Sequence, residues 1–237
     1  MSSDLPCDLY ILPELANSGY RFKDKEEART CAESISDSKF IKQLKKWAVG
    51  HNCYIVTGLC EKEHDKLYNS SVLIGPQGVE GIYRKLHLFM DEKGIFEPGN
   101  LGLPVFDTVL GKIGMLVCFD WMFPEAWRAM ALSGCQLIAH PSNLILPYCQ
   151  RVVTSYALVN KCFIATTNRV GEERGLQFTG HSVLASPNGD LLIDGSENNE
   201  GLYVAEIDIE QANDKHITSR NHVFNDRRID VYGSLNS

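Results

Sequence analysis

The sequence predicts an α/β protein with one large sheet or two sheets, because short apolar segments alternate with amphipathic ones along the chain. Two turn sequences, Pro76-Gln77-Gly78 and Pro187-Asn188-Gly189, each separate a pair of apolar segments and therefore predict β-hairpins. Of the 237 residues, 44% are hydrophobic and 22% are charged, the balance of an ordinary globular protein. Since no linker, repeat or shift in composition divides the chain, we expect one domain over residues 1–237.

The first half of the chain predicts four strands and one helix. An apolar run at Leu9–Leu12, ended by Pro13, is typical of a buried strand. Apolar residues fall on one face over Ser38–Val49, which predicts an amphipathic helix. The other expected strands are Cys53–Leu59, followed by Tyr68–Gly75 and Val79–Tyr83, which form the first hairpin.

The second half repeats this pattern. Pro124–Leu132 predicts a helix, because proline suits a first helical turn and Gly134 follows the end. A second helix is expected at Gln150–Asn160. The expected strands are Leu103–Val109, Lys112–Val117, Gln136–His140, Cys162–Thr167, His181–Ser186, Asp190–Ile193 and finally Leu202–Ile207.

Charge and apolar runs exclude several classes of partner. The net charge of −7 argues against nucleic acid, whose binding needs clustered lysines and arginines. No apolar run reaches 18 residues, so we expect no membrane span. The start, Met1-Ser2-Ser3-Asp4, lacks the basic and apolar regions of a signal peptide, which predicts a cytoplasmic protein.

Cysteines are numerous, but they lack the spacing of a metal site. In a cytosolic protein of this size we expect reduced thiols rather than disulfides. Without a C-x-x-C pair or a tight Cys/His cluster, no zinc site is expected, and nothing in the sequence calls for a cofactor. The eight cysteines are Cys7, Cys31, Cys53, Cys60, Cys118, Cys135, Cys149 and Cys162.

Three polar residues, Glu14, Lys85 and Cys118, directly follow or nearly follow predicted apolar strands, where a fold can hold and expose a side chain. A cysteine between a strand and a helix is well presented for nucleophilic attack. A nearby carboxylate can accept the thiol proton, and an ammonium can stabilise an oxyanion. Taken singly, each residue has an ordinary structural explanation as a buried thiol, a surface carboxylate or a solvated lysine.

Three stretches surround these residues: Leu12-Pro13-Glu14-Leu15 with Gly19-Tyr20, Tyr83-Arg84-Lys85-Leu86-His87-Leu88-Phe89, and Val117-Cys118-Phe119-Asp120 with Phe123-Pro124-Glu125. In content and order they resemble the nitrilase superfamily of carbon–nitrogen hydrolases, in its small single-domain amidase and nitrilase branch. Further landmarks extend the similarity from about Asp8 to Tyr232: Phe96-Glu97-Pro98-Gly99, Phe178-Thr179-Gly180-His181-Ser182, Pro187-Asn188-Gly189 and Asp226-Arg227-Arg228.

The resemblance implies a four-layer α-β-β-α sandwich and assigns roles in the site. Glu14 is the base, Cys118 the nucleophile and Lys85 the cation, and Glu92 is an additional carboxylate that orients the lysine. Its neighbours Asp91 and Glu97 are then loop or turn carboxylates, and His87 and His140 are structural. Substrate contacts are expected from Phe119, Trp121 and Asn143.

The function expected is hydrolysis of small amides through a cysteine thioester, with release of ammonia or an amine. The alternative is a nitrilase that converts small nitriles to carboxylic acids. A silent scaffold, an acyltransferase and a redox protein are weaker hypotheses, because all three catalytic positions are filled and neither membrane spans nor clustered cysteines occur. The stretch Trp121-Met122-Phe123 carries no cation, which predicts neutral or apolar acyl groups.

Two expectations concern assembly and the chain start. Apolar residues on more than one face of the two predicted second-half helices, together with the resemblance, predict a homodimer or higher homo-oligomer. Family members usually begin with a strand and a helix of some thirty-odd residues before the glutamate segment, whereas this chain reaches Leu9–Leu12 almost at once. We therefore expect that first unit to be lacking, with an exposed strand edge, and we favour a longer natural reading frame.

Overall fold

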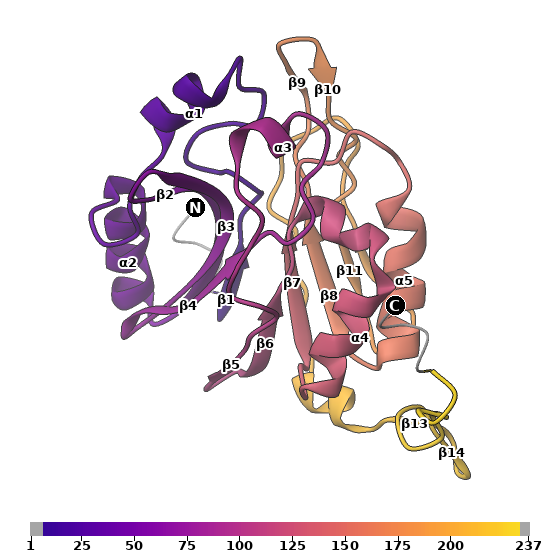
Figure 1. Cartoon of the computed structure of the whole chain (residues 1–237). Coiled ribbons are helices and arrows are strands. Elements are labelled where there is room, and N and C mark those ends of the chain that lie inside the picture. Colours follow the sequence, from indigo (N-terminus) through magenta and orange to yellow (C-terminus); the bar gives the residue numbers. More distant parts are fainter. Residues whose placement is uncertain (1–6, 233–237) are drawn as a thin grey trace.

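Two β-sheets face each other, and helices cover the outer side of each sheet (Figure 1). The computed structural model describes residues 7–232, so Met1-Ser2-Ser3-Asp4 lies outside the described residues. The first sheet has the order β1-β2-β3-β4, with strands β1 (Leu9–Ile11), β2 (Tyr54–Glu63), β3 (Lys66–Gly75) and β4 (Gly78–Arg84). Helices α1 (Lys25–Cys31) and α2 (Lys39–His51) lie against its outer side.

The second sheet has six strands in the order β12-β11-β8-β7-β6-β5. They are β5 (Val105–Thr108), β6 (Gly111–Met115), β7 (Leu137–Pro141), β8 (Phe163–Thr167), β11 (Val183–Ala185) and β12 (Leu191–Asp194). Helices α4 (Pro124–Leu132) and α5 (Cys149–Asn160) cover its outer side (Figure 1). The four-layer sandwich predicted from the sequence is therefore confirmed.

Shorter elements join these layers or decorate them. They are α3 (Glu92–Ile95), the 3₁₀ helices η1 (Cys118–Met122) and η2 (Ile209–Asn213), the hairpin of β9 (Glu172–Glu173) and β10 (Leu176–Gln177), and the pair β13 (His216–Thr218) and β14 (Asn221–His222). Figure 1 shows the β9–β10 hairpin rising on the same side of the molecule as α3. None of the helices in residues 7–232 combines the length and apolarity needed to cross a bilayer.

The main core lies between the two sheets. Val56 and Leu73 from the first sheet belong to the same buried apolar cluster as Ile113, Met115 and Ile138 from the second. A separate cluster seats α2 on the outer face of the first sheet through residues Ile41, Leu44 and Ala48. Because both faces of the first sheet are packed, the ends of its strands are held in place, which matters for any side chain attached there.

Strand directions bring two of the predicted site residues to one edge. β1 is parallel to β2, whereas β3 is antiparallel to β2 and β4 is antiparallel to β3. β1 and β4 therefore run in the same direction and end at the same edge of the sheet. Glu14 follows β1 and Lys85 follows β4, so the topology places both residues at this edge.

Most of the predicted elements are confirmed, including both hairpins and the helix Pro124–Leu132. One prediction is wrong: Leu202–Ile207 is not a strand. The segment has no ladder partner, and the side chains of Leu202 and Val204 are 50% and 49% exposed. An apolar segment alone does not make a strand, because strand hydrogen bonds need a neighbouring strand.

This segment lies beside a groove of about 1110 Å³ that is also lined by β1 and by residues of β6, β7, β8 and β11. Within the described residues, β1 has one strand neighbour, β2, and is the edge strand of its sheet. The first sheet has four strands and the second has six. The expectation of an exposed strand edge stays a prediction, since Tyr10 of β1 is buried.

Candidate active site

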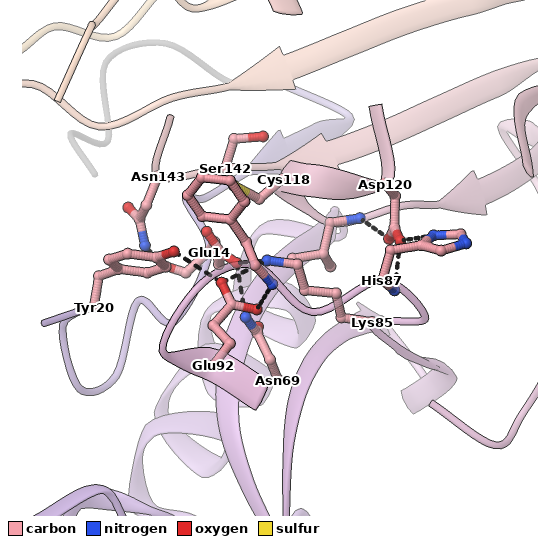
Figure 2. A network of polar contacts seen from close by, with 12 residues as sticks. Glu14, Tyr20, Asn69, Lys85, His87, Glu92, Cys118, Asp120, Ser142 and Asn143 are labelled. Atoms are coloured by element: carbon pink, nitrogen blue, oxygen red, sulfur yellow. Dashed lines mark hydrogen bonds and ion pairs between the residues drawn. The ribbon is translucent and has the colours of Figure 1, made fainter. Parts of the chain in front are cut away.

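One ammonium group lies between two carboxylates at the edge where β1 and β4 end (Figure 2). The Lys85 Nζ atom is 2.8 Å from Oε1 of Glu14 and 2.8 Å from Oε1 of Glu92. Glu92 opens the short helix α3, and all three side chains are almost completely buried. Burial removes the competition of water, so these ion pairs fix the geometry far more strongly than surface pairs would.

The carboxylate of Glu14 has one occupied oxygen and one free oxygen. Its Oε1 accepts hydrogen bonds from Lys85 Nζ at 2.8 Å and from Asn69 Nδ2 at 2.7 Å. Its Oε2 is buried and has no hydrogen-bond partner. A buried carboxylate oxygen without a donor is costly and unusual, so this atom is poised to accept a proton.

The third residue, Cys118, sits on the turn between β6 and the helices η1 and α4. Its backbone φ is +45°, in the left-handed region that a cysteine rarely adopts. The fully buried carboxylate of Asp120 holds this turn, because it accepts the Val117 N–H at 2.9 Å and the Tyr83 hydroxyl at 2.7 Å. His87 adds its backbone N–H and its ring to the other oxygen of Asp120.

The surroundings of Cys118 favour the protonated thiol. Burial raises the pKa of Cys118 well above its ordinary value, and the negative charges of Glu14 and Glu92 raise it further. Lys85 and a hydrogen bond from the Asn143 backbone act in the opposite direction without reversing the shift. Because Glu14 exerts the largest charge effect on this thiol, it is both near the sulfur and the natural acceptor of its proton.

The ammonium of Lys85 keeps its charge despite complete burial. Burial alone would lower the pKa of Lys85, but the charges of Glu14 and Glu92 outweigh it and raise the pKa well above the usual value. Burial raises the pKa of Glu92, with Lys85 opposing and Glu14 reinforcing that shift. The site therefore contains a fixed cation close to the nucleophile, which is the arrangement that stabilises a developing oxyanion.

A small apolar pocket opens over Cys118. Its other lining residues are Phe89, Phe119, Trp121, Asn143, Leu144, Ile145 and Leu146. None of these residues is charged. Asn143 is held at the pocket by one hydrogen of its Nδ2, which donates to the Glu14 backbone carbonyl at 2.9 Å. All three residues predicted to contact substrate thus line this pocket.

The structure also separates the predicted residues from their neighbours in sequence. Glu92 reaches Lys85, whereas Asp91 and Glu97 lie outside the site in ion pairs with Arg21 and Lys25. His140 contacts the Cys118 carbonyl oxygen through Nε2 at 2.9 Å, and His87 contacts Asp120.

Sequence reasoning gave no role to Asn69 or to Tyr20, although Tyr20 lies in one of the quoted stretches. Asn69 belongs to β3, where Asn69, Ser70 and Ser71 are all buried. Three consecutive polar residues inside an apolar strand are a usable signal, because buried polar side chains need specific partners. The partner of Tyr20 could not be read from the sequence, since its hydroxyl donates to Glu92 Oε1 at 2.9 Å across a gap of 72 residues.

A buried cysteine near a carboxylate and an ammonium, on a four-layer sandwich, is an arrangement suited to nucleophilic catalysis by a thiol. The model of the carbon–nitrogen hydrolase family matches residues 1–215 of this chain. A nitrilase from Pyrococcus abyssi is 47% identical over 224 residues, which cover 94% of this chain and 86% of that protein.

Solved structures of carbon–nitrogen hydrolases and amidases share this fold. A carbon–nitrogen hydrolase from Helicobacter pylori G27 superposes with a TM-score of 0.82 at 27% identity, covering 97% of this chain and 86% of the other. A mutant amidase from Nesterenkonia sp. AN1, which carries the acetamide moiety of fluoroacetamide on its active-site cysteine, has a TM-score of 0.68 at 26% identity and covers 81% and 74%. The chain belongs to the carbon–nitrogen hydrolase family, in the nitrilase superfamily, and is an enzyme of that family.

Tyr20 is predicted to support catalysis by holding Glu92 ionised. Its hydrogen bond lowers the pKa of Glu92, so Tyr20→Phe should raise that pKa and move the acid limb of the pH–rate profile to higher pH. We expect turnover at neutral pH to fall about tenfold, since a hydrogen bond to a charged group contributes ~1.5 kcal/mol or more. The pH dependence of kcat/KM measures this, with Tyr203→Phe on the exposed 196–207 segment as control. An unmoved acid limb would contradict the assignment.

Proposed function

We propose that this enzyme hydrolyses small neutral amides through a thioester on Cys118. The observation that carries the proposal is the free Oε2 of Glu14 near a buried thiol, with the Lys85 ammonium held on the other oxygen. In this arrangement a proton acceptor, a nucleophile and a cation converge. Glu92 completes the set by holding Lys85 from the far side.

The reaction then proceeds in two halves. Glu14 takes the thiol proton as the sulfur of Cys118 bonds to the carbonyl carbon, and the carbonyl electron pair moves onto oxygen. Lys85 and the backbone N–H of Phe119 stabilise that oxyanion. The carbon–nitrogen bond breaks as Glu14 returns the proton to nitrogen, so ammonia or an amine leaves. Glu14 next deprotonates a water molecule, which attacks the thioester and frees the acid and the thiol.

The pocket lining supports a neutral acyl group. A substrate carboxylate beside Phe119 or Trp121 would lose water without gaining a cation, which costs at least ~2 kcal/mol. We expect butyramide to exceed succinamate, and propylurea to exceed N-carbamoyl-β-alanine, by at least about 30-fold in kcat/KM. An ammonia-release assay with Cys118→Ala as background control measures both pairs. Preference for either carboxylate would show that a cation reaches the pocket and would refute this substrate class.

Nitrile hydrolysis is the second candidate, because the Pyrococcus abyssi relative is a nitrilase. The same thiolate can attack a nitrile carbon to form a thioimidate, which water then converts to acid and ammonia. Including butyronitrile in the ammonia-release assay separates the two activities. We place the amide first because Lys85 and the Phe119 N–H suit an oxyanion, which a nitrile does not form in its first addition.

We also propose a homodimer built on α4 and α5, working in the cytoplasm. Much of the apolar surface of these helices packs inside the chain: Trp127, Met130 and Val153 are buried, and Trp127 stacks on Tyr156. Leu132 and Val159 stay more than 40% exposed, which leaves apolar surface for a second copy. All eight cysteines are free thiols, which fits a reducing compartment.

A further inference from the structure

The fully buried histidine behind the nucleophile, His140, binds a backbone atom of the site. It lies on β7 and its Nε2 is 2.9 Å from the carbonyl oxygen of Cys118. A carbonyl oxygen can only accept, so Nε2 must carry the hydrogen. Nδ1 then has to be an acceptor, and the Thr166 hydroxyl on β8 lies 2.9 Å from it to donate. The Cys118 carbonyl therefore fixes the tautomer, and Thr166, with the more distant Ser142 hydroxyl at 3.5 Å, holds the acceptor side of the ring.

His140 stays neutral in this position. Burial lowers the pKa of His140 to about 4, with Lys85 contributing in the same direction. The hydrogen bond to the Cys118 carbonyl and the charge of Asp120 oppose this shift. At neutral pH the ring is therefore a hydrogen-bond donor of fixed geometry and not a base, and its donor atom faces the backbone and not the sulfur.

The consequence for the site follows from the planarity of the peptide bond. In a trans peptide the C=O of one residue and the N–H of the next point in opposite directions within one rigid plane. A hydrogen bond that holds the Cys118 carbonyl on the His140 side therefore also sets the direction of the Phe119 N–H. This N–H belongs to the first turn of η1, where backbone N–H groups have no partner within the helix. Phe119 and Cys118 line the same pocket.

We infer that His140, oriented by Thr166, is a positioning residue that aims the Phe119 N–H at the substrate oxyanion by holding the Cys118 carbonyl from behind. The inference rests on the proposed function for the role of the Phe119 N–H as an oxyanion donor. It also explains how the turn keeps the left-handed backbone of Cys118, since the carbonyl cannot rotate away without losing its buried donor.

Two reactions of the same thiol test this inference. Alkylation by iodoacetamide displaces iodide at a saturated carbon and needs no oxyanion donor. Reversible addition to butyraldehyde forms a sulfur–carbon bond while the carbonyl electron pair moves to oxygen, so it needs the donor. The aldehyde dissociation constant is measured by its protection of Cys118 against iodoacetamide, which requires no amide turnover.

We expect His140→Leu to weaken butyraldehyde binding about 30-fold or more, in line with the loss of one oxyanion donor, while the alkylation rate changes less than about threefold. The smaller change Thr166→Val should weaken butyraldehyde binding about fivefold and leave the alkylation rate unchanged. This variant tests the inference if His140→Leu does not fold. His181→Leu, at the exposed pair with Asp194, is the control. Equal losses in both reactions, or unchanged aldehyde binding in Thr166→Val, would overturn the inference. Tight aldehyde binding by a wild-type enzyme that releases no ammonia would instead reject the proposed function alone.

Discussion

Replacing Cys118 with alanine should lower amide turnover by at least about 10⁴-fold, because no other group in the pocket can form the covalent intermediate. The change removes one sulfur atom from a small buried side chain, so the fold should survive it. Mixing the wild-type enzyme with a slow amide and quenching in acid should leave an acyl group on the peptide that contains Cys118. Intact mass and peptide mapping measure that adduct.

The other seven cysteines provide the control for this experiment. Cys31 is partly exposed and is not among the residues that line the pocket, so Cys31→Ala should keep full turnover. The buried thiols Cys149 and Cys162 have pKa values raised by burial and lack a neighbouring carboxylate to remove the proton. Turnover retained by Cys118→Ala, or an adduct that maps to a different cysteine, would contradict the mechanism.

Local chemistry made much of the fold predictable. The helix Pro124–Leu132 was bounded correctly because proline and glycine mark helix ends through their own backbone restrictions. Both hairpins were located because turn residues act over a few positions. By contrast, α1 was missed, since only Ala28 of its seven residues is buried and no apolar stripe marks it. The segment Leu202–Ile207 had a strand pattern but no strand beside it, and pairing is not a local property.

The candidate site likewise has one part that was predictable from the sequence and one part that was not. Glu14, Lys85, Glu92 and Cys118 lie in recognisable sequence stretches, and the structure brings their charges together. The supporting contacts of Asn69 and Tyr20 could not be predicted, because each spans a long stretch of chain. The Asn69 amide reaches Glu14 across 55 residues, and other supporting contacts arise only when strands of a sheet or segments from both sheets meet. Recognition from sequence thus supplied the reacting groups, whereas the geometry that activates them required the fold.

Replacing Glu14 with glutamine should have two opposite effects on the same thiol. Turnover should fall by about 10³-fold, because the amide cannot accept the thiol proton or return one to the leaving nitrogen. The charge of Glu14 raises the pKa of Cys118, so its removal should lower that pKa and increase the thiolate fraction at a given pH. The pH midpoint of iodoacetamide alkylation should therefore move to lower pH while hydrolysis is lost.

The combination of lost hydrolysis and a lower alkylation midpoint distinguishes loss of the proton acceptor from general damage to the site. A disrupted site would lose hydrolysis without a directed shift in the alkylation midpoint, whereas loss of the base alone leaves a thiol that ionises more easily and hydrolyses nothing. Asp91→Asn is the matched control, since this exposed carboxylate pairs with Arg21 outside the site and should change neither readout. Retained turnover in Glu14→Gln, or an alkylation midpoint that rises, would show that another group takes the thiol proton. Of the groups near the sulfur, Glu92 is then the one to test, because it is the other carboxylate whose charge reaches Cys118 and it shares Lys85 with Glu14.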